Sequence, residues 1–167
     1  KPDQGDLVVF KTPADNRTDY IKRLIGMPGD KIQFKNGDLF INDEKIPKKK
    51  VNSKFIIKCG PFSPNVEAYE ETLPNGKTYL AVYNSDQSLQ NTDLFIVPDK
   101  HYFLLGDNRD CSKDSRFLTS VGYVNEFNLV GKAKMIFFSN DTEISSFLKF
   151  WNWKDSIRLN RFFKFLK

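Results

Sequence analysis

A dense run of ionic and hydroxyl side chains occupies residues 106–116, directly after the apolar segment 102–105. It reads Gly-Asp-Asn-Arg-Asp-Cys-Ser-Lys-Asp-Ser-Arg, with three aspartates, two arginines, one lysine and two serines. Far upstream, Lys22 interrupts the strand-like apolar run 20–25. A buried lysine amine held by polar groups can replace histidine as the base that activates a serine. Together the two segments suggest a serine hydrolase without a catalytic histidine.

Lys22 can act as a base only if its pKa is lowered. An ordinary lysine titrates near 10.4, so at neutral pH it is charged and accepts no proton. Burial disfavours the ammonium and so lowers the pKa, and the apolar neighbours of Lys22 can provide this burial. If this segment is a strand, the Arg23 side chain points to the face opposite that of Lys22. The alternative is an edge-strand lysine that discourages aggregation, and the residues by themselves favour this alternative.

The rest of the composition narrows the chemistry further. His101 is the chain's one histidine, which argues against a His-based triad and against a His-rich metal site. Cys59 and Cys111 allow one disulfide, and their spacing does not decide whether it forms. Because Cys111 lies within the charged run and Cys59 beside a Gly-Pro turn, we expect two free thiols. The net charge of +5 permits an anionic partner but is equally typical of a basic solvated surface.

The elements that must position these groups are mostly strands. Asn36-Gly37 between two short alternating segments predicts a hairpin with a type I′ turn, and residues 74–76 predict a second hairpin. We expect strands at residues 7–10, 20–25, 32–34, 39–41, 55–57, 67–73, 77–83, 94–97, 101–105 and 130–138.

The domain organisation follows from changes in polarity along the chain. Residues 1–47 and 94–138 form the expected catalytic β core, and the more polar residues 48–93 form an inserted β cap. Residues 139–167 carry six Lys/Arg against three Asp/Glu and many aromatics. Apolar side chains at helical spacing predict two amphipathic helices there, around 144–151 and 159–166. The tail suits a membrane interface or a helix packed on the sheet, and both remain open.

Three blocks of this sequence resemble the bacterial type I signal peptidases, membrane-bound Ser–Lys proteases that release signal peptides from exported proteins. The blocks are residues 5–13, 19–30 and 106–116, and they occur in the order of that family. The resemblance implies a mostly β fold, a signal-peptidase-like core of twisted antiparallel sheets with an inserted β cap and a short C-terminal helix. It covers the core but not the insert.

The resemblance also implies roles for individual residues. Lys22 matches the general base, and Ser112 matches the serine that orients its amine. The positions that match the structural support of the site are Asp107, Arg109, Asp114 and Arg116. The signal peptide lies extended along the lysine strand in this family, and the matching substrate-binding positions are Val9, Asp19, Tyr20 and Ile21.

The family's nucleophilic serine has no match here. Its motif lies upstream of the first matched block, so we expect this chain to be the interior of a longer polypeptide and inactive alone. Ser112 and Ser115 are disfavoured as substitutes because the resemblance gives Ser112 a supporting role. No metal or organic cofactor is implied.

The expected partners are signal peptides of exported preproteins and the membrane surface, and no nucleic acid is expected. We expect a monomer at the cytoplasmic membrane, with its catalytic domain facing the periplasm or exterior. The alternative from another class is a non-catalytic β module that binds anionic membrane or RNA through its basic tail. A self-cleaving repressor-type Ser–Lys protease is disfavoured by the long charged block and the insert.

Overall fold

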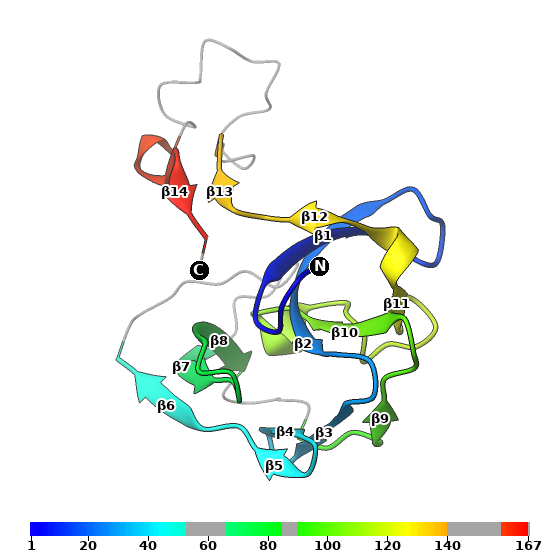
Figure 1. Cartoon of the computed structure of the whole chain (residues 1–167). Helices are drawn as coiled ribbons and strands as arrows, with labels where there is room; N and C mark the ends of the chain where they lie inside the picture. The colour runs from blue at the N-terminus through cyan, green and yellow to red at the C-terminus, as the bar shows by residue number, and fades with distance from the viewer. Residues whose placement is uncertain (53–65, 85–89, 140–157, 167) are drawn as a thin grey trace. The chain divides into compact units, whose positions relative to one another are not determined.

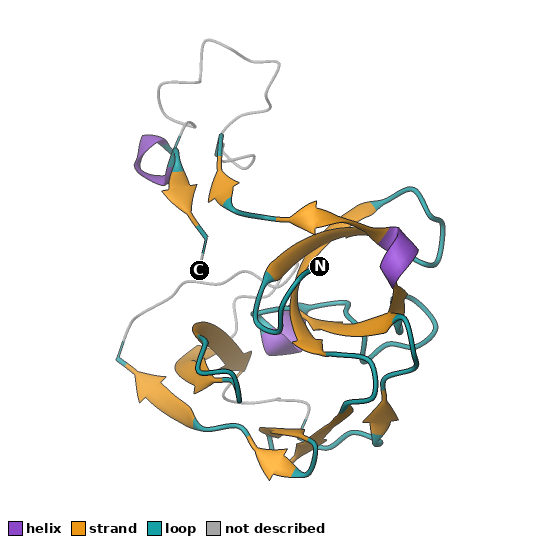
Figure 2. Ribbon diagram, viewed as in Figure 1, coloured by secondary structure: helices purple, strands orange, loops and turns teal. Residues whose placement is uncertain are grey.

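The structure is a computed structural model that describes residues 1–52, 66–84, 90–139 and 158–166. The chain divides into two units, residues 1–132 and residues 133–167, and each is considered by itself. Among the residues that the structure describes, strands dominate, and helix is limited to short 3-10 turns (Figures 1 and 2). The prediction of a mostly β fold with several antiparallel sheets is confirmed. Within the described ranges, no helix is long and apolar enough to span a membrane.

A five-stranded antiparallel sheet carries the predicted chemistry. Its strand order is β11-β10-β2-β1-β12. The 3-10 helix η2 (Glu126–Asn128) joins the two edge strands, so the sheet curls back on itself (Figure 1). The strands are β1 (Leu7–Lys11), β2 (Asp19–Gly26), β10 (His101–Leu105), β11 (Val124–Asn125) and β12 (Leu129–Lys132).

Two further sheets lie in the described part of this unit. One has the order β5-β4-β3-β9 and the other β6-β7-β8. Asn36 and Gly37 both have positive φ, 50° and 77°, as the predicted type I′ turn requires. The strands are β3 (Lys31–Lys35), β4 (Asp38–Ile41), β5 (Glu44–Lys45), β6 (Lys48–Val51), β7 (Val66–Thr72), β8 (Thr78–Asn84) and β9 (Phe95–Ile96).

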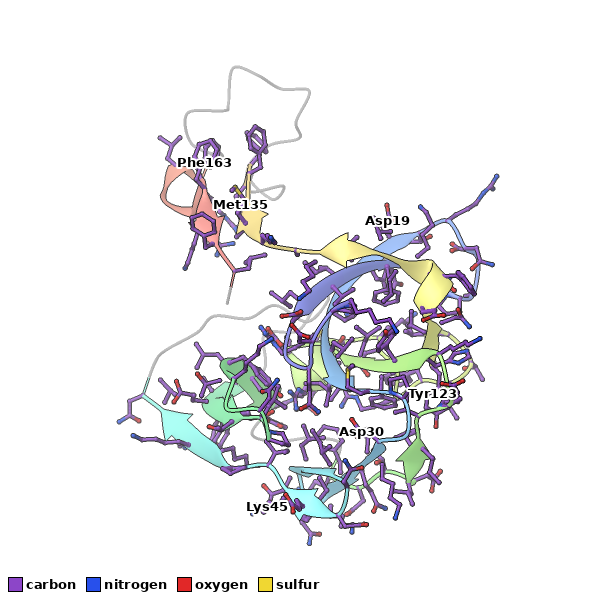
Figure 3. All side chains as sticks on the ribbon, viewed as in Figure 1. Asp19, Asp30, Lys45, Tyr123, Met135 and Phe163 are labelled. Atoms are coloured by element: carbon purple, nitrogen blue, oxygen red, sulfur yellow. The ribbon has the colours of Figure 1, made fainter. Side chains whose placement is uncertain are left out.

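Two hydrophobic clusters form on opposite faces of β2 and β10, because side chains alternate along a strand. Leu24 and Leu104 belong to the cluster enclosed by the curled sheet. Ile25 and Leu105 belong to the larger cluster, which also contains buried residues of β3, β4 and β8. Strand β8, which lies in the expected insert, thus contributes to the main core. Figure 3 draws the side chains on the ribbon, with Asp19 projecting from β2.

The chain from residue 129 onward corrects two predictions. Residues 130–138 are not one strand: β12 ends at Lys132, and β13 (Met135–Ile136) belongs to another sheet. The helix predicted at 159–166 is also wrong, since the 3-10 helix η4 (Leu159–Arg161) is followed by β14 (Lys164–Phe165) paired with β13. Aromatic side chains favour a pleated surface, and Phe163 packs on Phe137 there. The predicted elements at 55–57 and 144–151 lie outside the described residues.

Candidate active site around Lys22

Lys22 and Ser112, ninety positions apart in the sequence, meet in the structure. The Lys22 Nζ donates a hydrogen bond to the Ser112 Oγ over 2.7 Å. Lys22 lies on the same face of β2 as Leu24, and Ser112 follows the 3-10 helix η1 (Arg109–Cys111). The Tyr20 ring, on the same face, lies 5.6 Å from the Nζ. The lysine amine therefore has a fixed direction and an apolar neighbour.

Burial lowers the pKa of Lys22 below its ordinary value. Desolvation is the largest cause, because the ammonium loses more hydration than the neutral amine does. The Asp114 and Asp107 carboxylates oppose this change and raise the pKa, whereas the Arg116 guanidinium lowers it. A lowered lysine pKa in such a setting is typical of a group that exchanges protons.

Gly106 makes room for Ser112. A Cβ added at Gly106 would lie 2.1 Å from the Ser112 Oγ and 2.3 Å from its Cβ. Both distances are far below an ordinary contact, so any larger residue at position 106 would displace Ser112. The requirement for glycine at this position is one of space.

Two ion pairs hold residues 106–116, here called the polar loop. Asp114, which is fully buried, accepts from Arg116 Nε and Nη2 at 2.8 Å each and also from the Gly106 backbone N–H at 3.0 Å. Asp107 accepts from Arg23 Nε and Nη2, again at 2.8 Å each. Arg23 points away from the Lys22 face, as strand alternation requires. The second pair therefore ties β2 to the loop from the far side of the sheet.

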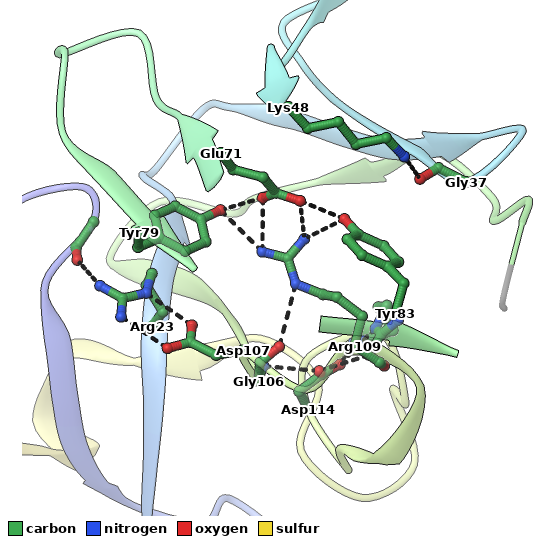
Figure 4. A network of polar contacts seen from close by, with 12 residues as sticks. Arg23, Gly37, Lys48, Glu71, Tyr79, Tyr83, Gly106, Asp107, Arg109 and Asp114 are labelled. Carbon is green, nitrogen blue, oxygen red and sulfur yellow. Dashed lines mark hydrogen bonds and ion pairs between the residues drawn. The ribbon is translucent and has the colours of Figure 1, made fainter. Parts of the chain in front are cut away.

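Arg109 has a buried partner that the sequence did not identify. Its guanidinium and the Glu71 carboxylate are each 1% exposed and are joined by two hydrogen bonds of 2.9 and 3.2 Å. The hydroxyls of Tyr79 and Tyr83 also donate to this carboxylate (Figure 4). The hairpin register places Glu71 opposite Tyr79, so the predicted turn at 74–76 was the one available indication of this contact.

One edge of β2 is open beside Lys22. The ladder between β2 and β1 continues to the pair Asp19↔Lys11, whereas the ladder with β10 ends at Arg23↔Leu105. Residues 19–22 therefore pair with β1 alone among the described strands. An extended peptide can add to such an edge by backbone hydrogen bonds.

The four predicted substrate-binding residues divide between the two faces of β1 and β2. Val9 is the cross-strand partner of Ile21, which is 49% exposed, and Asp19 lies on this same face of β2. Tyr20 shares the opposite face with Lys22. A peptide along the open edge would place alternate side chains on these two faces.

The expectation of two free thiols is wrong. Cys111 is disulfide-bonded. The chain's only other cysteine is Cys59, which lies outside the described residues. Neighbouring charge in the sequence is a poor guide here, because the pairing depends on which segments the fold brings together. The disulfide is formed by the residue next to Ser112.

Comparison with known proteins identifies the family. The family model described as signal peptidase, peptidase S26, matches residues 1–138. The chain belongs to this family. The signal peptidase I of Rickettsia conorii is 43% identical over 98% of this chain and 65% of its own length. That of Rickettsia prowazekii is 43% identical over 98% of this chain and 66% of its own length.

The chain spans about two thirds of the length of these rickettsial relatives, at 65% of the first. Among solved structures, a signal peptidase I from Enterococcus faecalis is 25% identical, with a TM-score of 0.46, covering 80% of this chain and 97% of its own. Lys22, Ser112 and the three ion pairs of the site all lie within the 138 residues that match the family model.

Proposed function

We propose that this chain forms the lysine-bearing part of a serine endopeptidase that removes signal peptides from exported preproteins. The observation that carries the proposal is the 2.7 Å contact between the desolvated Lys22 amine and Ser112, beside the open edge of β2. A low-pKa amine at a strand edge combines a base with a place for an extended peptide. Membership of the signal peptidase family supports the same reaction.

Lys22 is the general base in this proposal. Its neutral amine takes the proton from a serine hydroxyl while the serine oxygen attacks the scissile carbonyl carbon, and backbone N–H groups stabilise the oxyanion. The ammonium then gives that proton to the leaving amine, and an acyl-enzyme remains. Lys22 next takes a proton from water, which attacks the ester, and returns it to the serine. The nucleophile is the serine that the family carries upstream of the matched blocks.

Ser112 orients the amine rather than attacking the substrate. It receives a hydrogen bond from the Lys22 Nζ and is confined by Gly106 behind it. Ser115 is a poor nucleophile because it is fully buried, and its hydroxyl accepts from the Leu104 backbone N–H at 2.9 Å. The Asp114–Arg116 pair supports this loop from beneath.

The substrate in this proposal is an extended segment with small side chains at two positions before the scissile bond. Residues 19–22 supply backbone groups, while Val9 and Ile21 on one face and Tyr20 on the other shape the pockets. We assign the site to the outer side of the cytoplasmic membrane, and the disulfide at Cys111 favours such an oxidising setting. The proposal needs no metal or organic cofactor and treats the chain as a monomer.

A second candidate function rests on the second unit. Three phenylalanines there are strongly exposed: Phe137 at 72%, Phe163 at 60% and Phe165 at 70%. The described residues 133–139 and 158–166 carry four basic side chains and no acidic one. Aromatic and basic groups together suit an anionic lipid surface. Binding of residues 1–167 to vesicles containing phosphatidylglycerol, lost on Phe163→Ser with Phe165→Ser, would support this role.

Cleavage of a peptide with an Ala-x-Ala site tests the main proposal. Residues 1–167 would be compared with the longest native form that contains them. We expect cleavage by the native form only, and its loss on Lys22→Ala. Cleavage by residues 1–167 alone would make a serine of this chain the nucleophile. A native form that is folded, binds vesicles and cuts no such peptide would favour the second candidate.

A further inference from the structure

We propose that Glu71 is a positioning residue for Lys22: the β7–β8 hairpin, through Glu71, fixes the loop that holds Ser112 against the lysine amine. This inference rests on the proposed function. Glu71 lies in the segment 48–93, which is not covered by the sequence blocks that resemble the family. The inference therefore gives part of that segment a role in the chemistry of the site.

The Glu71 carboxylate is saturated with donors (Figure 4). Its Oε2 accepts from Arg109 Nη2 at 2.9 Å and from the Tyr79 hydroxyl at 2.6 Å. Its Oε1 accepts from Arg109 Nη1 at 3.2 Å and from the Tyr83 hydroxyl. Burial raises the pKa of both tyrosines, which keeps them protonated as donors. A buried ion pair with every lone pair occupied holds a single arrangement.

Arg109 transmits this arrangement to the loop. Its Nε donates to the Gly106 carbonyl at 3.2 Å, and its own carbonyl accepts from Arg116 Nη2. Arg116 in turn is paired with Asp114. Ser112 lies between these fixed points, three residues after Arg109 and in close approach to Gly106. The position of the Ser112 hydroxyl therefore depends on where the guanidinium is held.

Strand β8 fastens the same loop by its backbone. The Val82 N–H donates to the Asp107 carbonyl at 2.8 Å, and the Asn84 N–H donates to the Asp110 carboxylate at 2.7 Å. Val82 also forms a parallel bridge with Asn108. The loop is thus held by β8 on both sides of Arg109, and Glu71 supplies the charge at the centre of the attachment.

Loss of the Glu71 charge should move Arg109. An arginine stays protonated under all these conditions, so a guanidinium without its carboxylate must reach water or another anion. That movement releases the Gly106 carbonyl and loosens Ser112. Water then reaches the Lys22 amine, and the lysine titrates at higher pH. This consequence distinguishes positioning from a purely structural role.

The test is the titration of Lys22 in residues 1–167, followed by NMR of the lysine Cε and assigned with Lys22→Arg. The principal variant is Glu71→Gln, and Tyr83→Phe is a milder change that removes one donor. Glu70→Gln, on the exposed face of β7, is the matched charge control. Leu73→Ala removes a buried side chain near the turn and provides a destabilised control, since Leu73 has no polar contact with Arg109.

We expect Glu71→Gln to raise the Lys22 midpoint, Tyr83→Phe to raise it less, and both controls to leave it unchanged. In the native form, Glu71→Gln should lower kcat/KM for the Ala-x-Ala peptide at least tenfold at pH 7 and move its acid limb to higher pH. A depressed Lys22 midpoint that is unmoved in Glu71→Gln and Tyr83→Phe overturns this inference. An ordinary midpoint in the unmodified chain instead overturns the general base of the proposed function, so the two failures are distinct.

Discussion

Gly106→Ala is expected to disable the site with a change of one methyl group. The added Cβ would lie 2.1 Å from the Ser112 Oγ, and an ordinary contact begins at 3.4 Å. Ser112 must therefore retreat by about 1.3 Å, the difference between these distances. A misplacement of about 1 Å at a catalytic group can cost roughly a hundredfold in rate. We expect kcat/KM of the native form to fall by about a hundredfold, with about 1–3 kcal/mol lost in stability from overpacking.

Peptide cleavage and thermal unfolding, measured on the same preparations, check this prediction. Gly131→Ala is the matched control, because nothing lies within 4 Å of a Cβ at that position and its φ is not in the positive region. The control should keep full activity. A Gly106→Ala enzyme within twofold of the unmodified one would show that the close approach of Ser112 has no importance for turnover.

Three further predictions concern charge and the disulfide. Lys22→Met should reduce cleavage at least about a hundredfold, as expected on loss of a general base. Burial lowers the pKa of Lys22 below 10.5, so the unfolded chain binds the lysine proton more tightly than the folded chain does. Lys22→Met should therefore raise the free energy of unfolding at pH 7. For the same reason, the stability of the wild type should rise with pH through the interval below 10.5. Denaturation at pH 7 and pH 10 checks both signs. Burial opposes ionisation of Asp6, but its hydrogen bonds with Lys132 and Lys77 lower its pKa from 3.8 to about 2. Because solvent screens these surface pairs, Asp6→Asn should cost only about 1 kcal/mol at pH 7, and the wild-type advantage should vanish as the pH falls from 4 towards 2. Cys111→Ser should cost about 2–5 kcal/mol, the usual loss when a native disulfide is removed, and a reductant should destabilise the wild type but not this variant.

Local pattern was sufficient for the strands that have strong turn chemistry. Alternating apolar residues around Asn36-Gly37 and around 74–76 gave both hairpins, because glycine and asparagine tolerate the positive φ that such turns need. The C-terminal segment shows the limit of this reasoning. Apolar residues at 159, 162, 163 and 166 fit a helical period, yet pairing of β14 with β13 determines the structure there. Tertiary pairing of this kind is not encoded in a local period.

The site was predictable only where one segment carries most of its groups. Residues 106–116 contain the Asp114–Arg116 pair entirely, so a local motif can indicate it. Glu71 meets Arg109 across 38 positions, through a hairpin whose docking on the loop no local pattern reveals. The same holds for the pair of Arg23 with Asp107 and for the disulfide at Cys111. Long-range partners of buried charges have to be read from the fold.

The central claim, that the Lys22 amine is the base, is tested most directly by removing and restoring that amine. The native form with Lys22→Cys would be assayed on the Ala-x-Ala peptide before and after alkylation with bromoethylamine, which rebuilds a side chain of lysine length that ends in an amine. Cys111 is already disulfide-bonded, which protects it from the reagent. We predict no cleavage before alkylation and substantial recovery after it, with none in Lys22→Ala treated in parallel. Cleavage by the unalkylated Lys22→Cys protein would contradict the claim.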